Sequence, residues 1–290
     1  MGSAKWYLFN LHFSCMMLDW GATVLSIPFL ILPAIGGYPI GILSNWFGVP
    51  AVVQTYSIVT LVFVVGASIV VIFENRYYQL YARESKWKHW RIPFIVFNYI
   101  LTLTFFIPIC LSYPDQKMAL EYTYAQIPNL PEEIKAGRLF ILSIEYWVQI
   151  PFNLMGLFVA GESFFFIGLI NRNMNRTARQ VTLSENTMKM QRKFLKAIYA
   201  QVGGFLTNVL APMTYMFVSI LANYYNQFGN NMVFIIGALH GINSTLIMLW
   251  AHKPYQEVCR NMIKRGRSLV KLPNPVARST QPIGSGTVLI

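Results

Sequence analysis

Charged residues are scarce in this sequence. Only 12% of the 290 residues are Asp, Glu, Lys or Arg, whereas 55% are hydrophobic. An ordinary soluble domain has roughly 25% charged residues. The few charges lie mostly in the segments between long apolar runs. This pattern excludes an ordinary soluble globular protein and indicates a polytopic membrane protein.

Cysteine is also scarce, and the three residues of this type, Cys15, Cys110 and Cys259, lie far apart in the chain. Their spacing gives neither a disulfide framework nor a metal-binding motif. The sequence likewise contains no Ser-His-Asp arrangement and no phosphate-binding loop. We therefore predict that the protein is not an enzyme and requires no cofactor.

Acidic residues are outnumbered, because 23 Lys and Arg stand against 11 Asp and Glu and give a formal net charge of +12. A basic balance can indicate a nucleic-acid partner. Here, however, the basic residues are concentrated in alternate loops between apolar runs. Retention of positive loops on the cytoplasmic side of a membrane explains this distribution, so we predict no nucleic-acid partner.

The longest clear signal is a charge-free run over 49–73. It exceeds the ~20 residues that a helix needs to cross the hydrocarbon core of a bilayer. Glu74, Asn75, Arg76 and Tyr77 follow it, and a basic loop comes next. The run therefore predicts a transmembrane helix whose Tyr77 end lies near the cytoplasm.

The whole chain is predicted to be an all-α, polytopic membrane helix bundle over 1–270 with a disordered cytoplasmic tail over 271–290. Both termini are expected inside, because the loops assigned to the cytoplasm hold most of the Lys and Arg. A turn is expected at 36–39, and 113–138 is expected to form an exposed loop with one short helical turn. Six spans are predicted, at about 8–33, 49–73, 92–112, 141–170, 197–222 and 231–251.

Two features at the predicted cytoplasmic boundary are candidate switch elements. The Arg76 guanidinium could hold a carboxylate of a neighbouring helix in the resting state; the alternative is an interfacial arginine beside an aromatic anchor. At the end of the last span, Pro254 stops the helix and precedes Tyr255. Cys259 follows on a surface segment, where palmitoylation and an unmodified thiol are both open.

Several polar side chains fall inside the predicted spans: His12, Asp19, Glu162, His240 and Asn243. Ionisable groups at membrane depth usually face a bundle interior or a cavity. Asp19 and Glu162 could serve as sodium or proton ligands, or remain neutral and hydrogen-bonded. Prolines in the spans can kink helices and create an apolar cavity, which would suit a small apolar ligand.

Several segments together resemble the nematode chemosensory receptors called serpentine receptor class H, a seven-helix family. They occur in the family's order at 5–13 (KWYLFNLHF), 27–29 (IPF), 47–50 (FGVP), 72–77 (IFENRY), 194–197 (FLKA), 223–227 (NYYNQ), 239–241 (LHG), 244–245 (ST) and 252–255 (HKPY).

The resemblance implies a G-protein-coupled receptor for environmental chemicals in the plasma membrane of sensory cilia, with a heterotrimeric G protein as partner. It implies a coupling role for Glu74, Arg76, Tyr77, Pro254 and Tyr255. The six spans would be the second to seventh helices of the family, with the first helix missing. The sequence alone leaves two alternatives open: a small transporter or channel, and a non-signalling membrane subunit.

Overall fold

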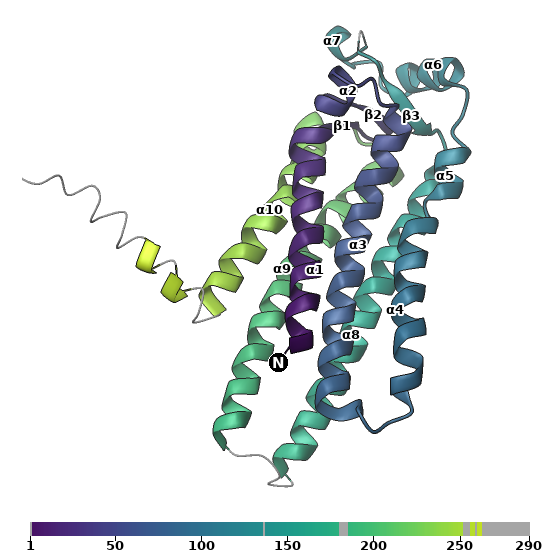
Figure 1. The fold of residues 1–290 in the computed structure, drawn as a ribbon. Coiled ribbons are helices and arrows are strands. Elements are labelled where there is room, and N and C mark those ends of the chain that lie inside the picture. The colour runs from purple at the N-terminus through teal and green to yellow at the C-terminus, as the bar shows by residue number, and fades with distance from the viewer. Residues whose placement is uncertain (1, 136, 180–184, 252–255, 259, 263–290) are drawn as a thin grey trace, which may run out of the picture. The chain divides into compact units, whose positions relative to one another are not determined.

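The computed structural model describes residues 2–135, 137–179, 185–251, 256–258 and 260–262 (Figure 1). Residues 1–247 form one compact unit and residues 248–290 form a second. The first unit contains the helix bundle, a small sheet and the greater part of the last long helix.

The helix α3 (Ala51–Tyr77) is the centre of the bundle, and it matches the predicted span over 49–73. Every residue from Val65 to Asn75 is buried. Around it pack α1 (Gly2–Trp20), α4 (Trp87–Thr104) and α8 (Gln149–Arg179). Aromatic rings fill the junctions: Phe63 makes edge contacts with Phe105 and Phe152 at centroid distances of 5.0 and 5.3 Å. The bundle therefore buries α3 on several sides.

The remaining helical elements extend or connect these helices. Two of them are long, α9 (Glu185–Leu221) and α10 (Gln227–Ala251). The short ones are η1 (Gly21–Leu25), α2 (Ile42–Asn45), η2 (Tyr78–Ala82), α5 (Ile107–Leu111), α6 (Gln116–Gln126), α7 (Glu132–Lys135) and η3 (Tyr146–Val148).

Four helices of the described residues are long and apolar enough to cross a membrane: Ala51–Ala82, Trp87–Leu111, Tyr146–Arg176 and Val202–Leu221. They correspond to four of the six predicted spans. The α1 and α10 helices are not among these four, so their spans stay predictions. On α1, large apolar side chains such as Trp6 and Phe9 are exposed, at 74% and 61% of their surface. Such a surface suits a lipid environment.

The expected all-α architecture needs one correction, because three strands form an antiparallel sheet in the order β1-β2-β3. They are β1 (Pro28–Ile31), β2 (Ile35–Pro39) and β3 (Phe140–Ser143). The helical part of the predicted span 8–33 therefore ends at Leu25, and that of the span 141–170 begins at Tyr146.

Local chemistry explains the strands. Pro28 has no backbone N–H to continue a helix, and it disfavours helical geometry in the residue before it. The predicted turn at 36–39 is instead β2. A side chain at Gly36 would overlap Ile141, and one at Gly37 would overlap the Phe29 carbonyl. The two glycines therefore let the neighbouring strands come close on both sides.

The segment 113–138 is more ordered than the predicted exposed loop. Asp115 caps α6 by accepting hydrogen bonds from the backbone N–H groups of Lys117 and Met118, both at 3.1 Å. Ile127 and Leu130 are buried in a cluster with Ile31 of β1. Figure 1 shows α2, α6, α7 and the strands together at one end of the bundle, which we call the sheet end.

Candidate functional site

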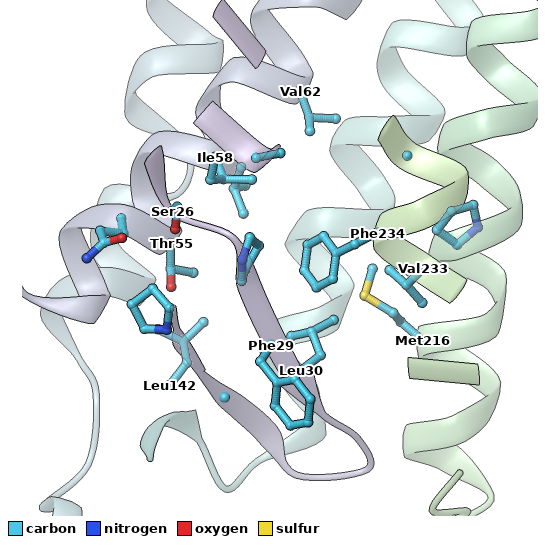
Figure 2. A pocket seen from close by; sticks show the side chains of 18 of the residues that line it. Ser26, Phe29, Leu30, Thr55, Ile58, Val62, Leu142, Met216, Val233 and Phe234 are labelled. Carbon is cyan, nitrogen blue, oxygen red and sulfur yellow. The ribbon is translucent and has the colours of Figure 1, made fainter. Parts of the chain in front are cut away.

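A cavity of about 250 Å³ lies at the sheet end of the bundle. Its wall comes from α1, α3, α8, α9 and α10 together with all three strands. Figure 2 shows Phe29 and Leu30 of β1 on one side of it and Met216, Val233 and Phe234 of α9 and α10 on another. The cavity therefore joins segments that are far apart in the sequence.

Most of the wall is apolar. On α3, Ile58 and Val62 face it, and the Pro212 and Met213 side chains of α9 add to it. Gly237 of α10 also lines it, and a Cβ atom placed there would meet nothing within 4 Å. An apolar concave site with a few polar groups is typical of small-molecule binding sites.

Three buried amide side chains line the cavity: Gln54, Gln149 and Asn208, with exposed fractions of 2%, 7% and 8%. Each has one atom without a hydrogen-bond partner among the described residues. These atoms are Gln54 Oε1, Gln149 Nε2 and Asn208 Nδ2. Buried polar groups are normally hydrogen-bonded, so these three are exceptions. Each of the three atoms has less than 1 Å² of accessible surface, although its residue lines the cavity.

Asp19, one of the predicted intramembrane polar residues, also lines the cavity. Its carboxylate lies against the backbone of Gly241, where a Cβ atom would overlap it. The absence of a side chain at Gly241 therefore permits the contact between α1 and α10.

The other end of α3 holds a polar network centred on Glu74, whose side chain is fully buried. The Arg91 Nε atom donates to Glu74 Oε2 at 2.9 Å, and the Trp87 indole N–H donates to Glu74 Oε1 at 2.8 Å. Both partners lie in the first turns of α4. The buried charge of Glu74 is thus compensated by one cation and two hydrogen bonds.

Arg91 also contacts three residues other than Glu74. Its Nη2 atom donates to the Tyr7 hydroxyl at 2.8 Å and to Asn75 Oδ1 at 2.7 Å. Its guanidinium carbon also lies 4.4 Å from the ring centroid of Tyr78, a cation–π distance. Only 14% of the Arg91 side chain is exposed. We call Glu74, Asn75, Trp87, Arg91, Tyr7 and Tyr78 the Glu74 network; it joins α1, α3, η2 and α4.

A smaller polar cluster lies on α3 between the cavity and the Glu74 network. Asn10 of α1 donates to Ser68 Oγ at 3.0 Å and to the Tyr99 hydroxyl of α4 at 2.6 Å. The Ser68 and Tyr99 hydroxyls lie 3.2 Å apart. The same three helices that meet in the Glu74 network are therefore connected here by neutral hydrogen bonds.

Glu162, the second predicted intramembrane carboxylate, pairs with an amide of α4. The Asn98 side chain is fully buried and its Nδ2 atom donates to Glu162 Oε1 at 3.4 Å. Glu162 is not among the residues that line the cavity. The structure therefore does not bring Asp19 and Glu162 together at the cavity. No group of three or more His, Cys, Asp or Glu side chains that could bind a metal occurs among the described residues.

The structure describes some of the other predicted site residues and not others. Arg76 and Tyr77 end α3, and the Tyr77 ring packs 6.0 Å from that of Phe166. His12 is partly buried on α1. The side chains of His240 and Asn243 lie outside the described part of α10, and the described residues do not include Pro254, Tyr255 and Cys259.

The sequence offers two interpretations of Arg76, a guanidinium–carboxylate pair with a neighbouring helix or an interfacial arginine, and both stay predictions. The structure builds such a pair from Glu74 and Arg91. In the sequence, Arg91 is one of the basic residues that follow the 49–73 run and predict its orientation. The pair depends on how α4 packs against α3, so the sequence carries no signal for it. Gln54, Gln149 and Asn208 carried no sequence signal, because polar residues are common at helix ends and faces.

The family comparison is consistent with this arrangement of helices. The family described as serpentine type 7TM GPCR chemoreceptor Srh matches residues 1–265. The chain belongs to this family. It is therefore a membrane protein of a chemosensory receptor family rather than of an enzyme family. No match was found among curated proteins or among solved structures.

Proposed function

We propose that this Srh receptor binds a small, largely apolar chemical in the cavity at the sheet end and signals to a heterotrimeric G protein at the opposite end. The observation that carries the proposal is the cavity itself. It is apolar, it is formed by five helices and the sheet, and it has a volume of about 250 Å³. A ligand that contacts so many helices can favour one arrangement of them over another.

The proposal includes a membrane topology. All six predicted spans cross the plasma membrane as the second to seventh helices of the seven-helix plan, and α1 and α10 are two of them. The sheet end faces outward, because the basic segment 83–91, which includes the first turns of α4, lies at the other end of α3, and positive segments stay in the cytoplasm. By the family resemblance, the receptor would reside in sensory cilia.

The Glu74 network is the proposed switch at the cytoplasmic end. It ties α3 to α4 and α1 through charged hydrogen bonds that need close approach of the three helices. A ligand that shifts these helices would weaken the Glu74–Arg91 pair and change the surface formed by Arg76, Tyr77 and the basic loops. That surface is where a G protein would bind.

Filling the cavity tests the proposal. Gly237→Phe adds a large ring where the cavity has open space, so the receptor should still fold and reach the cell surface while its response to chemicals is lost. Gly168→Phe is the matched control. A Cβ atom at Gly168 also meets nothing within 4 Å, but this glycine of α8 does not line the cavity. The measurement is G-protein activation in cells exposed to a mixture of volatile compounds, normalised to surface expression.

A full response by the Gly237→Phe receptor would contradict binding in this cavity. A response lost equally in both variants would show damage to the bundle rather than occupation of the site. Chemical binding without G-protein activation in the unmodified receptor would favour the non-signalling subunit, and a ligand-dependent ion flux would favour the transporter or channel.

A further inference from the structure

The β1 strand lies at one edge of the three-stranded sheet. The Phe29 carbonyl is close to Gly37 of β2. The carbonyls of Leu30 and Leu32 alternate in direction with that of Phe29, so they lie on the opposite side of the strand. No strand of the described residues pairs with this side. Leu32 is buried, so its carbonyl needs a donor from another part of the chain.

Two side-chain amides of α10 donate to this edge. Gln227 Nε2 donates to the Leu30 carbonyl at 3.1 Å. Asn230 Nδ2 donates to the Leu32 carbonyl at 3.3 Å. Residues three apart lie on one face of a helix, and carbonyls two apart lie on one side of a strand, so the two spacings match. The first turn of α10 therefore takes the place of a fourth strand.

Asn230 is fully buried and also contacts α9. The Leu32 carbonyl only accepts hydrogen bonds, so the Asn230 amide nitrogen must face it. The Tyr215 hydroxyl of α9 donates to the other amide atom, Asn230 Oδ1, at 3.1 Å. A Cβ atom at Gly229 would overlap the Tyr215 side chain, so this glycine permits the contact. We call the bonds from Gln227 and Asn230 to β1 the β1 latch.

The β1 latch lies at the edge of the cavity. Leu30 lines the cavity on one side of the latch, and Val233 and Phe234 of α10 line it on the other (Figure 2). Val233 is three residues beyond Asn230, so the two lie on the same side of α10. Leu32 and Asn230 are not among the lining residues. The latch therefore joins two parts of the wall at their rim, where separation of β1 from α10 would open the cavity.

The opposite edge of the sheet has a different partner. Gln116 of α6 donates from Nε2 to the Ile141 carbonyl of β3 at 3.0 Å and accepts from the Ile141 N–H at 2.9 Å. The α6 helix belongs to the segment that leads into β3, so this edge can move together with α6. The β1 edge, by contrast, is bonded to a long helix of the bundle.

We propose that the β1 latch is the gate through which a ligand enters the cavity. Its two hydrogen bonds break, β1 separates from α10, and the bonds form again behind the ligand. This inference rests on the proposed function, because it gives the entry route to the same cavity. A hydrogen bond between neutral groups favours the closed form only about fivefold, so two such bonds permit frequent opening.

The test measures access to the cavity without a receptor ligand. Thr55 lines the cavity (Figure 2), and Thr55→Cys places a thiol of similar size there. The purified full-length receptor in detergent is treated with N-ethylmaleimide, a small uncharged thiol reagent. Mass spectrometry follows the peptide that contains residue 55, so labelling of the native cysteines does not enter the measured rate.

We expect Asn230→Leu and Gln227→Leu each to raise the labelling rate of Thr55→Cys about fivefold, because each removes one bond that keeps the latch closed. Gln116→Leu is the matched control, since it removes the same kind of amide from the opposite edge of the sheet. Its labelling rate should change by less than about twofold, which is below the effect of a typical lost hydrogen bond.

An equal rise in Gln116→Leu would overturn the proposal, because any loosening of the sheet would then admit the reagent. An unchanged rate in Gln227→Leu would also overturn it. Gln227 is only partly buried, so this variant decides the question if Asn230→Leu does not fold. The proposed function is judged separately: if the gate fails this test but Gly237→Phe still abolishes the response, the ligand binds in the cavity and enters by another route.

Discussion

The buried polar side chains at the two ends of α3 differ in their hydrogen bonding. At the sheet end, Gln54 lines a cavity and keeps an unpartnered oxygen. At the other end, Glu74 is fully buried, yet both of its oxygens accept hydrogen bonds and Arg91 balances its charge. Twenty residues of helix separate the two, a distance of about 30 Å at 1.5 Å per residue.

This difference indicates that the two ends of α3 have different roles. A buried polar atom left without a partner costs free energy, so the amides at the sheet end weaken the fold while the cavity beside them leaves space for a ligand. A network that is satisfied internally is stable by itself and must be broken before it can rearrange. One end is therefore suited to binding, and the other to holding a resting arrangement.

The largest change in the free energy of unfolding is expected when the Glu74–Arg91 pair is broken. Arg91→Met would leave the buried Glu74 carboxylate without its cation, and should lower the free energy of unfolding by about 3–5 kcal/mol. The uncharged pair Glu74→Gln/Arg91→Gln should recover most of this loss, because an amide oxygen remains to accept from Trp87. Unfolding in mixed micelles measures both.

Lys88→Met is the control for that experiment. Lys88 is an exposed basic residue of the same helix turn, so its loss should change the unfolding free energy by less than about 0.5 kcal/mol. Equal effects of Arg91→Met and Lys88→Met would show that the Glu74–Arg91 pair contributes nothing particular.

An increase in the free energy of unfolding is expected at the sheet end, where buried amide atoms lack partners among the described residues. Asn208→Leu removes an amide nitrogen that lacks a partner among the described residues and replaces it with an apolar side chain. The receptor should become more stable by about 1–2 kcal/mol. Thr207→Val, at an exposed neighbouring position, should have little effect. A less stable Asn208→Leu receptor would mean that the amide is needed by the fold itself.

The smallest change in the free energy of unfolding is expected for the polar cluster between the two ends of α3. Ser68→Ala removes the hydroxyl that contacts Asn10 and Tyr99, and should cost about 0.6 kcal/mol, the usual size of a hydrogen bond between membrane helices. Ser57→Ala is a matched control. Both serines donate to the carbonyl four residues earlier at 2.8 Å, but Ser57 is exposed. Indistinguishable unfolding free energies would show that the polar cluster does not tie the helices together.

The sequence predicted the helices better than it predicted the ends of the bundle. The charge-free run over 49–73 identified α3, because a long apolar segment has few structures available to it in a membrane. The sheet was missed, because Gly36 and Gly37 act by letting other strands approach, and those strands are far away in the sequence.

The sequence identified candidate site residues only where one residue stands out by itself. Glu74 stood out as a lone carboxylate at the end of an apolar run, and Asp19 as one within a span. The partnership with Arg91 depends on how α4 packs against α3, which local sequence does not determine. The convergence of Gln54, Gln149 and Asn208 on one cavity depends likewise on the packing of three helices.

The central claim is that the cavity and the Glu74 network are coupled through the helices that they share. The most direct test is the affinity for a compound that activates the receptor, measured in the unmodified receptor and in Glu74→Gln/Arg91→Gln, whose stabilities should be similar. If the ion pair holds the resting arrangement, removing its charges should raise the affinity about fivefold or more, which is the usual lower range of coupling between two sites. An unchanged affinity, with binding intact, would contradict the coupling.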